Sequence, residues 1–470
     1  MQSLPTSPVP QQTSAGTGNA PVRLRTEAAS PRGSAAQRQR EAVLLAFCEP
    51  MPAACAILKD LTARQWQPLL RWLDTSGLAL YFLDRLSDLE LCAMLPPRVL
   101  ARLQQNLADN TARTQSMASE WTALNRLFQK AGLSYATLKG FSLWPISVPK
   151  TELRSQLDLD FLVSEESSAG ARAILEGVGY RLSAIGDRSW EFKTGHEQPP
   201  SLKTLYTAKP QRSVELHIER QNATSAPLLS RTEDRCFYGA FLPVLSPVDL
   251  FLGQAMHVYK HVSSSFARTA HLIELRRHVL VRHHDDAFWK EARRIAERDA
   301  KPPIALGVVM LLISQVMGEF APEALTCWTV DRLPLAVRTW VELYGKRVAL
   351  GSFPGSKLYL LLQKEVEAAG IPAKRPVRRA LLPSRLPPAI AHRVPGETAA
   401  ARVKRNARQL HFIFFRLRFH TVEGLRYVCE SFRWRRRLDR LACQRGLPSA
   451  RSPFALHVDE VRIEGNRIPR

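Results

Sequence analysis

The sequence lacks the features that would place the chain outside the cell or within a membrane. Its N-terminus has no hydrophobic signal segment, and its longest apolar run, residues 304–317, falls short of the roughly 20 residues that span a bilayer. Seven scattered cysteines include no pair with the close spacing of a zinc knuckle or a redox motif. We therefore expect reduced, mostly buried thiols in a soluble, cytoplasmic protein.

Acidic residues are scarce relative to basic ones. The chain has 66 Lys and Arg against 43 Asp and Glu, which gives a formal charge of +23. Such an excess favours polyanionic partners such as nucleic acid, nucleotides or an anionic membrane surface, although an arginine-rich genome would also produce it. Residues 374–445 alone hold 19 Lys and Arg against 4 Asp and Glu. Nucleic acid or another polyanion is therefore a candidate partner of this C-terminal region.

Length and local composition divide the chain into five regions. At 470 residues it exceeds what one hydrophobic core usually supports. Helical periodicity flanks a strand-rich segment, and proline and arginine accumulate after it. The predicted regions are a disordered low-complexity tail (1–36), a helical N-terminal region (37–130), a nucleotidyltransferase-type core (131–245), a helical region packing on that core (246–348) and a basic Pro/Arg-rich C-terminal region (349–470) with a linker over 371–397.

The central segment predicts an α+β fold with mixed or antiparallel strand pairing. Alternating and apolar runs of four to eight residues are typical of strands. A long helix is expected over residues 98–129, and Ser246-Pro247 is a helix start with serine at the cap. The predicted strands are residues 133–138, 157–163, 180–184, 189–193, 202–207 and 213–218.

Two aspartates one residue apart carry the chemical signal. Asp158 and Asp160 enter the second predicted strand, after a Lys139-Gly140 turn that follows the first. Alternate side chains of a strand share a face, so the carboxylates point the same way, about 6–7 Å apart. They repel one another unless a cation lies between them. Mg²⁺ prefers such carboxylates together with phosphate oxygens, so the pattern favours a metal-phosphate site over a solvated strand edge.

Nucleotidyl transfer needs carboxylates for divalent ions and donors for a triphosphate, and the neighbouring residues supply both. Glycine lets the backbone approach phosphates, and basic side chains neutralise their charge. On the strand 213–218, Glu215 shares a face with His217 and could bind the metal or deprotonate the acceptor. The predicted site comprises Asp158, Asp160 and Glu215 as catalytic and metal-binding residues, and Lys139, Gly140, Ser142 and Arg154 as phosphate-binding residues.

These residues resemble a known family. The order Leu-Lys-Gly, Arg154, Asp-x-Asp before hydrophobic residues, and a helix ending in Gly-Tyr is similar to uncharacterised bacterial nucleotidyltransferases of the polymerase-β superfamily. The strand with Glu215-Leu216-His217, and a later helix with His257 and His261, resemble further elements of that family. The resemblance implies transfer of an NMP from a nucleoside triphosphate, expected to be ATP, to a hydroxyl or phosphate acceptor. Mg²⁺ or Mn²⁺ would be the cofactor and pyrophosphate the second product.

Three positions depart from the family pattern. Leu157 replaces a small residue before the first aspartate, Glu215 replaces an aspartate, and Glu274 stands where the family has a later aspartate. All carboxylate functions are retained, which favours an active enzyme. His217, His257 and His261 are candidates for substrate contact. Zinc binding at His257 and His261 is not expected, because no third ligand with suitable spacing accompanies them.

Two alternatives stay open at this point. Asp-x-Asp also binds the metal of sugar-nucleotide glycosyltransferases, although that chemistry assigns no role to the Lys-Gly turn or to the later acidic strand. A non-catalytic protein that binds nucleic acid through its C-terminal arginines would show salt-sensitive binding that is independent of Asp158.

Overall fold

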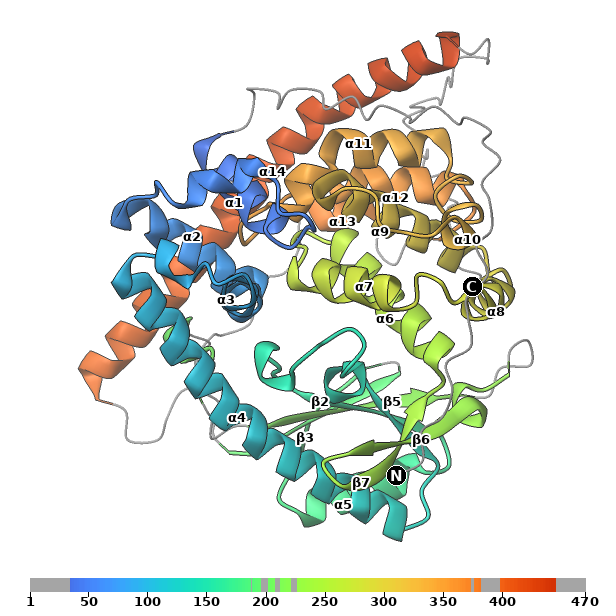
Figure 1. Cartoon of the computed structure of the whole chain (residues 1–470). Helices are drawn as coiled ribbons and strands as arrows, with labels where there is room; N and C mark the ends of the chain where they lie inside the picture. The colour runs from blue at the N-terminus through green and yellow to red at the C-terminus, as the bar shows by residue number, and fades with distance from the viewer. Residues whose placement is uncertain are drawn as a thin grey trace, which may run out of the picture.

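A computed structural model describes residues 34–186, 188–195, 202–207, 212–220, 226–372, 376–381 and 398–444. It confirms the predicted α+β fold class. A seven-stranded mixed sheet lies on one side of a larger helical assembly, with α6 and α7 nearest the sheet (Figure 1). The predicted disordered tail, up to residue 33, and most of the predicted linker lie outside the described residues.

The helices before and after the sheet share one hydrophobic core. This core contains large, fully buried side chains such as Trp66, Trp289 and Trp340, which come from distant parts of the chain. The helices are α1 Ala35–Leu45, α2 Ala63–Ser76, α3 Ala79–Asp88, α4 Pro97–Lys130, α5 Ser168–Gly177, α6 Pro247–Val262, α7 Ala270–Val281, α8 Asp286–Ala296, α9 Lys301–Met317, α10 Glu323–Thr326, α11 Leu335–Ala349, α12 Tyr359–Ala368, α13 Val377–Leu381 and α14 Ala399–Gln444.

The sheet has the strand order β3-β4-β5-β2-β1-β7-β6. β2 runs parallel to β5, and β1 parallel to β7, whereas the other neighbours are antiparallel. Pairing is therefore mixed, as predicted. The strands are β1 Tyr135–Leu138, β2 Leu159–Ser164, β3 Arg181–Ile185, β4 Ser189–Lys193, β5 Ser213–Glu219, β6 Thr232–Phe237 and β7 Ala240–Leu245.

Alternation along β2 and β5 separates an apolar face from a polar one. Phe161 and Leu216 are fully buried in a cluster that includes residues of α4 and α5. Their sequence neighbours point to the opposite face, because successive side chains of a strand alternate. These neighbours are Asp160 in β2, and Glu215 and His217 in β5. Leu162, on that same face, packs with Leu250 of α6. The polar residues therefore lie on the α6 side of the sheet.

Two parts of the strand prediction were wrong. Residues 202–204 form a short 3-10 helix instead of a strand. The hairpin β6–β7 was not predicted, although it forms one edge of the sheet. Its turn, Tyr238-Gly239, has two positive φ angles, 47° and 76°, but carries tyrosine where Asn or Asp is usual. Pro243 inside β7 also weakens the strand pattern, because proline has no backbone N–H for pairing.

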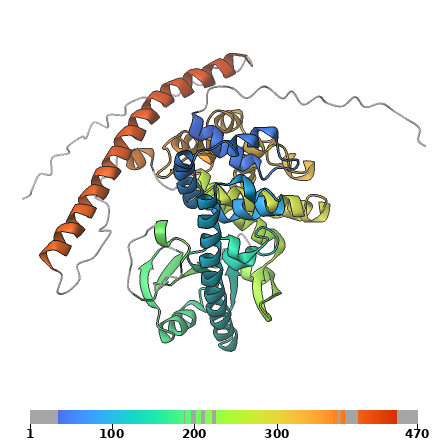
Figure 2. The ribbon, with the colours of Figure 1, turned by 60° about the vertical axis from the view of Figure 1, so that its left-hand side comes forward.

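The long helix α4 joins the helical assembly to the sheet. Its 34 residues extend about 50 Å at 1.5 Å per residue. Figure 2 shows it passing from the helical side down to the sheet. Its middle also holds the loop that leads into β2: Asn110 donates to the carbonyl of Glu152 at 2.6 Å, and the Arg113 guanidinium donates to the carbonyl of Gln156. The helix therefore positions the segment that carries Arg154 and Asp158.

The C-terminal basic segment forms a single helix, α14, of 46 residues. It runs along the outside of the helical assembly (Figure 2). Trp434 anchors it by donating from Nε1 to Glu365 of α12 at 2.8 Å, and Tyr427 is also buried. Several of its apolar side chains, including Phe414 and Phe432, remain exposed. Polyanion binding by this helix stays a prediction.

The burial of the cysteines differs from the expectation. All seven cysteines lie among the described residues and are unpaired. Only Cys48 and Cys55 are buried, and four are exposed, so the prediction of mostly buried thiols was wrong.

Among the helices that the structure describes, none combines the length and apolar character of a membrane span.

The packing of α4 on the sheet predicts that alanine substitutions at two neighbouring residues, Phe128 and Leu127, lower the free energy of unfolding by very different amounts. Phe128 is fully buried, with ring centroids 5.2 Å from Phe161 and 5.3 Å from Tyr135, whereas Leu127 is 36% exposed. We expect Phe128→Ala to lower the free energy of unfolding by about 3–5 kcal/mol. Leu127→Ala should change it by less than about 1 kcal/mol. Urea-induced unfolding followed by circular dichroism measures both, and equal losses would contradict this packing.

Candidate active site

The Lys139-Gly140 turn has an unusual backbone. Both residues have positive φ angles, 48° for Lys139 and 44° for Gly140, and Lys139 is one of few non-glycine residues with such an angle. A Cβ atom on Gly140 would lie 2.4 Å from Nε2 of Gln156. That amide donates to the carbonyl of Asp158 at 2.7 Å. Glycine therefore lets the turn lie against the loop before β2 without backbone strain at position 140 and without displacing this amide.

Ser142 supports the turn from inside. It is fully buried in the 3-10 helix Gly140–Leu143, and its hydroxyl donates to the carbonyl of Lys139 at 2.7 Å. Its backbone N–H donates to the same carbonyl at 2.8 Å. Ser142 thereby stabilises the strained turn that presents Lys139. Phosphate binding by Ser142 stays a prediction.

Asp160 is the centre of a compact polar cluster. Its Oδ1 accepts from Lys139 Nζ at 2.7 Å and lies 3.0 Å from His217 Nε2. His217 Nε2 lies 3.5 Å from Glu215 Oε2 and 3.3 Å from Lys139 Nζ. One ligand atom from each of Asp160, Glu215 and His217 lies within 4.8 Å of the other two. The structure thus brings together four residues that the sequence analysis selected.

The register of the sheet explains this meeting. Asp160 of β2 is the Cα partner of Glu215 in β5, and Glu215 is in turn the partner of Glu191 in β4. Cross-strand partners share a face, so the three carboxylates form a row across the sheet. Glu191 was not selected from the sequence, because only strand pairing places it beside Glu215. Its carboxylate binds Lys193 at 3.0 Å.

The two aspartates differ in their ease of ionisation. Burial disfavours the charged form of Asp160, but hydrogen bonding from His217 and the charge of Lys139 lower its pKa to about 2. Burial and the neighbouring Asp160 charge raise the pKa of Asp158, despite the opposing charges of Lys139 and Arg154. At Asp158, the nearby cations therefore do not fully offset burial and the negative charge of Asp160. An additional cation would be favourable there.

Arg154 is fixed by the helical assembly. Its Nε donates to Glu274 Oε1 of α7 at 3.1 Å, and the hydroxyl of Tyr81 in α3 donates to the same oxygen at 2.9 Å. Glu274 is 2% exposed, so this ion pair is nearly buried. Leu157, one of the three positions that depart from the family pattern, is 47% exposed and therefore does not disturb the hydrophobic core. Glu274 positions Arg154, a role that spacing alone did not reveal.

A cavity of about 620 Å³ lies next to this cluster. Lys139 and His217, which contact Asp160, line it, and so does Arg154. Its wall contains an excess of basic residues over acidic ones. The basic residues are Lys139, Arg154, Arg188, Arg220, Arg231 and Arg298, and the acidic ones are Glu219, Asp249, Glu274 and Asp299. A cavity of this size and charge suits a ligand with several phosphates.

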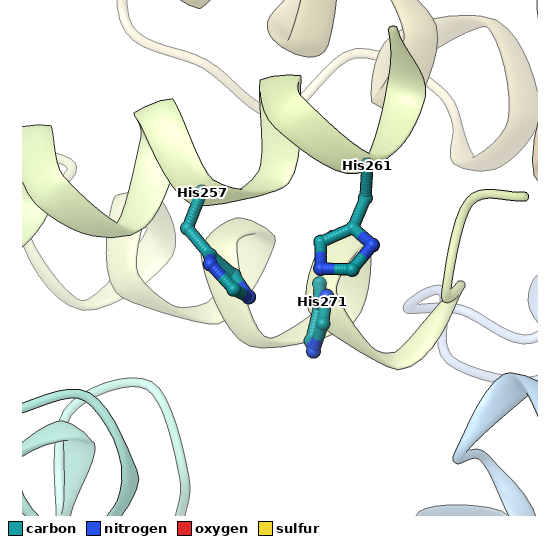
Figure 3. Close-up of side chains that lie close together, drawn as sticks. All are labelled: His257, His261 and His271. Carbon is teal, nitrogen blue, oxygen red and sulfur yellow. The ribbon is translucent and has the colours of Figure 1, made fainter. Parts of the chain in front are cut away.

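The histidines of α6 lie on the cavity side. His257 lines the cavity, and His261 follows one helical turn later. His271 of α7 joins them and also lines the cavity (Figure 3). The premise that no third histidine accompanies the pair was therefore wrong, because the helices bring together residues that the sequence separates. Burial lowers the pKa of His257 to about 3 and that of His261 to about 4, so both are neutral at physiological pH.

A family model described as an uncharacterised nucleotidyltransferase matches residues 62–311, slightly more than half of the chain. The chain belongs to this family. The match spans α2 to α9 and includes every residue of the polar cluster and the cavity wall. No curated protein matches the chain significantly. The resemblance identified from the Lys-Gly turn and the Asp-x-Asp strand is thus confirmed at the level of the family and of a nucleotidyltransferase-type fold.

The conformation of the Lys139-Gly140 turn predicts that Gly140→Ala destabilises this member of the nucleotidyltransferase family. Alanine there should cost about 1–2 kcal/mol for its left-handed backbone. It should cost about 1 kcal/mol more by displacing the Gln156 amide from Asp158. Gly132→Ala is the matched control, since Gly132 has φ +64° but open space around it, and it should show the first cost alone.

A double-mutant cycle separates the two costs. In a Gln156→Ala background the destabilisation by Gly140→Ala should fall to that of Gly132→Ala, measured by urea-induced unfolding. An unchanged cost in that background would show that Gln156 does not constrain the turn.

Proposed function

We propose that this protein transfers a nucleoside monophosphate from a Mg²⁺-bound nucleoside triphosphate to a hydroxyl or phosphate acceptor and releases pyrophosphate. The observation that carries the proposal is the convergence of Asp160, Glu215 and His217 with Lys139 beside a basic cavity. Family membership supports the general activity. The metal, the donor and the acceptor are our inference from the chemistry of the side chains.

The donor set fits a hard divalent ion. Asp158, Asp160 and Glu215 offer carboxylate oxygens, which Mg²⁺ and Mn²⁺ prefer. Burial and, after it, the neighbouring Asp160 charge raise the pKa of Asp158, and a bound cation would favour its charged form. These three residues would hold the metal, and Glu191 stands next in the same row. When bound, the metal would neutralise phosphate charge and align the triphosphate.

The remaining groups have roles in binding and proton transfer. Lys139 is 31% exposed on its side chain and lines the cavity, so its ammonium can reach phosphate oxygens. Arg154, held by Glu274, adds a fixed positive charge. The Glu215 carboxylate, 31% exposed, is available to accept the proton of an acceptor hydroxyl. As the acceptor oxygen bonds to the α-phosphorus, the bond from that phosphorus to the bridging oxygen breaks and pyrophosphate leaves.

The two alternatives gain less support. Glycosyl transfer assigns no function to the strained Lys139-Gly140 turn, which here contacts the Asp-x-Asp strand directly. The family match also lies with nucleotidyltransferases. Binding of nucleic acid by the arginines of α14 is compatible with nucleotidyl transfer and would concern a separate surface.

Calorimetry with each of the four nucleoside triphosphates, with and without Mg²⁺, tests the proposal. We expect saturable binding of at least one of them that requires Mg²⁺. Asp158→Asn should weaken it by about 100-fold or more, because the metal loses a charged ligand. Asp160→Asn should act in the same direction, with circular dichroism to confirm folding.

Asp234→Asn on the edge strand β6 is the control, since Asp234 is exposed and lies outside the cluster. It should leave the affinity unchanged. Binding of sugar nucleotides in place of nucleoside triphosphates, or full affinity in the Asp158→Asn variant, would refute the proposed function.

A further inference from the structure

Three histidines form a second cluster on the helices above the sheet. His257 and His261 belong to α6 and His271 to α7, with ring centroids 4.7, 4.8 and 5.0 Å apart. One ring nitrogen from each lies within 4.8 Å of the other two. Figure 3 shows the three imidazoles turned toward a shared space between the two helices. Such an arrangement offers three nitrogen ligands to a single ion.

These rings have little else to bind. Nδ1 of His271, a residue only 6% exposed, has no hydrogen-bond partner among the described residues. His261 bonds the backbone of Phe266. A buried polar atom without a partner is costly, and an ion between the rings would remove that cost.

We propose that His257, His261 and His271 bind a borderline transition-metal cation, Zn²⁺ above all, in a site separate from the carboxylate cluster. Neutral imidazoles suit zinc, and three of them leave a fourth tetrahedral position open. Zinc ligands lie about 3.3 Å apart at Zn–N distances of about 2.05 Å. The three nitrogen atoms, which lie within 4.8 Å of one another, would have to move closer to reach that spacing. The hydrogen bond of His261 to Phe266 is the kind of outer contact that orients a metal-binding ring.

The charges around the cluster constrain the fourth ligand. Positive charges act on all three rings and disfavour an uncompensated dication; they come from Lys139, Arg154, Lys260 and Arg268. Glu274, one helical turn after His271, already binds Arg154. An anionic fourth ligand would therefore be favoured, such as hydroxide or an oxyanion of a bound molecule. His257 and His271 both line the 620 Å³ cavity, so the open position is accessible from it.

The donor sets keep the two proposed metals apart. Carboxylate oxygens dominate on the sheet, whereas the helical cluster offers nitrogen atoms alone. Hard Mg²⁺ favours the first set and zinc the second. The histidine site therefore does not rest on the proposed nucleotidyl transfer and can be tested without nucleotide.

The experiment uses the full chain, stripped of metal with a chelator and then titrated with Zn²⁺ alone in competition with a chromophoric indicator. We expect one equivalent of Zn²⁺ per chain to bind. Titration with Co²⁺ alone should produce the intense visible bands of tetrahedral coordination. His257→Ala/His261→Ala should weaken zinc binding by at least about 100-fold. His271→Asn should do the same while preserving a polar side chain in the core.

A second histidine pair provides the matched control. His283 and His284 are adjacent, with Nδ1 atoms 3.5 Å apart, and belong to no three-residue cluster among the described residues. His283→Ala/His284→Ala should leave zinc affinity unchanged. The proposal is overturned if folded wild-type protein binds no zinc and gives no tetrahedral Co²⁺ bands, or if the cluster variants bind as tightly as the wild type. Co²⁺ bands that persist in the folded Asp160→Asn variant support the site even where a cluster variant fails to fold, because that variant disrupts the other three-residue cluster.

Discussion

The parallel pairing of β2 with β5, beside antiparallel β1, is the constraint on which the site depends. It aligns Asp160 with Glu215, and the antiparallel pairing of β1 with β2 places the end of β1 next to Asp160, so that Lys139 reaches that carboxylate at 2.7 Å. Asp160 is only 4% exposed, and a carboxylate buried to that extent must find positive charge or hydrogen-bond donors. Lys139 and His217 provide them. A register shift of one residue would turn Asp160 toward the apolar face and break the whole cluster.

The helical assembly determines the other half of the site, although the carboxylates of the polar cluster, Asp160 and Glu215, come from the sheet. α4 holds the loop before β2 through Asn110 and Arg113, and α7 holds Arg154 through Glu274. Tyr81 of α3 shares that glutamate, so elements from both ends of the family match meet at one oxygen atom. This connection explains why a catalytic-type sheet is embedded in a much larger helical protein. The helices orient Arg154, which we propose as a phosphate-binding residue.

The parts of the site that sequence predicted are those set by strand periodicity. Alternation alone places Asp160 and Glu215 on polar faces, and the Lys-Gly turn marks the end of β1. Local turn geometry and long-range packing decided the rest. The direction of the Ser142 hydroxyl depends on one 3-10 turn, the role of Glu274 depends on where α7 packs, and Glu191 enters the row only through the pairing of β4 with β5. The β6–β7 hairpin was missed because its turn and Pro243 lack the usual strand signals.

The cavity lies next to groups of both charges, basic side chains and carboxylates, and this limits what can occupy it. Its wall carries more basic than acidic side chains, and the row of carboxylates lies on the sheet next to it, in contact with Lys139 and His217 of the wall. A lone dication would suit the carboxylates but not the arginines, and a lone polyanion would suit the arginines but not the carboxylates. A triphosphate bound together with a metal ion satisfies both. The proposed histidine site follows the same logic, since its positive surroundings favour zinc with an anionic ligand over zinc alone.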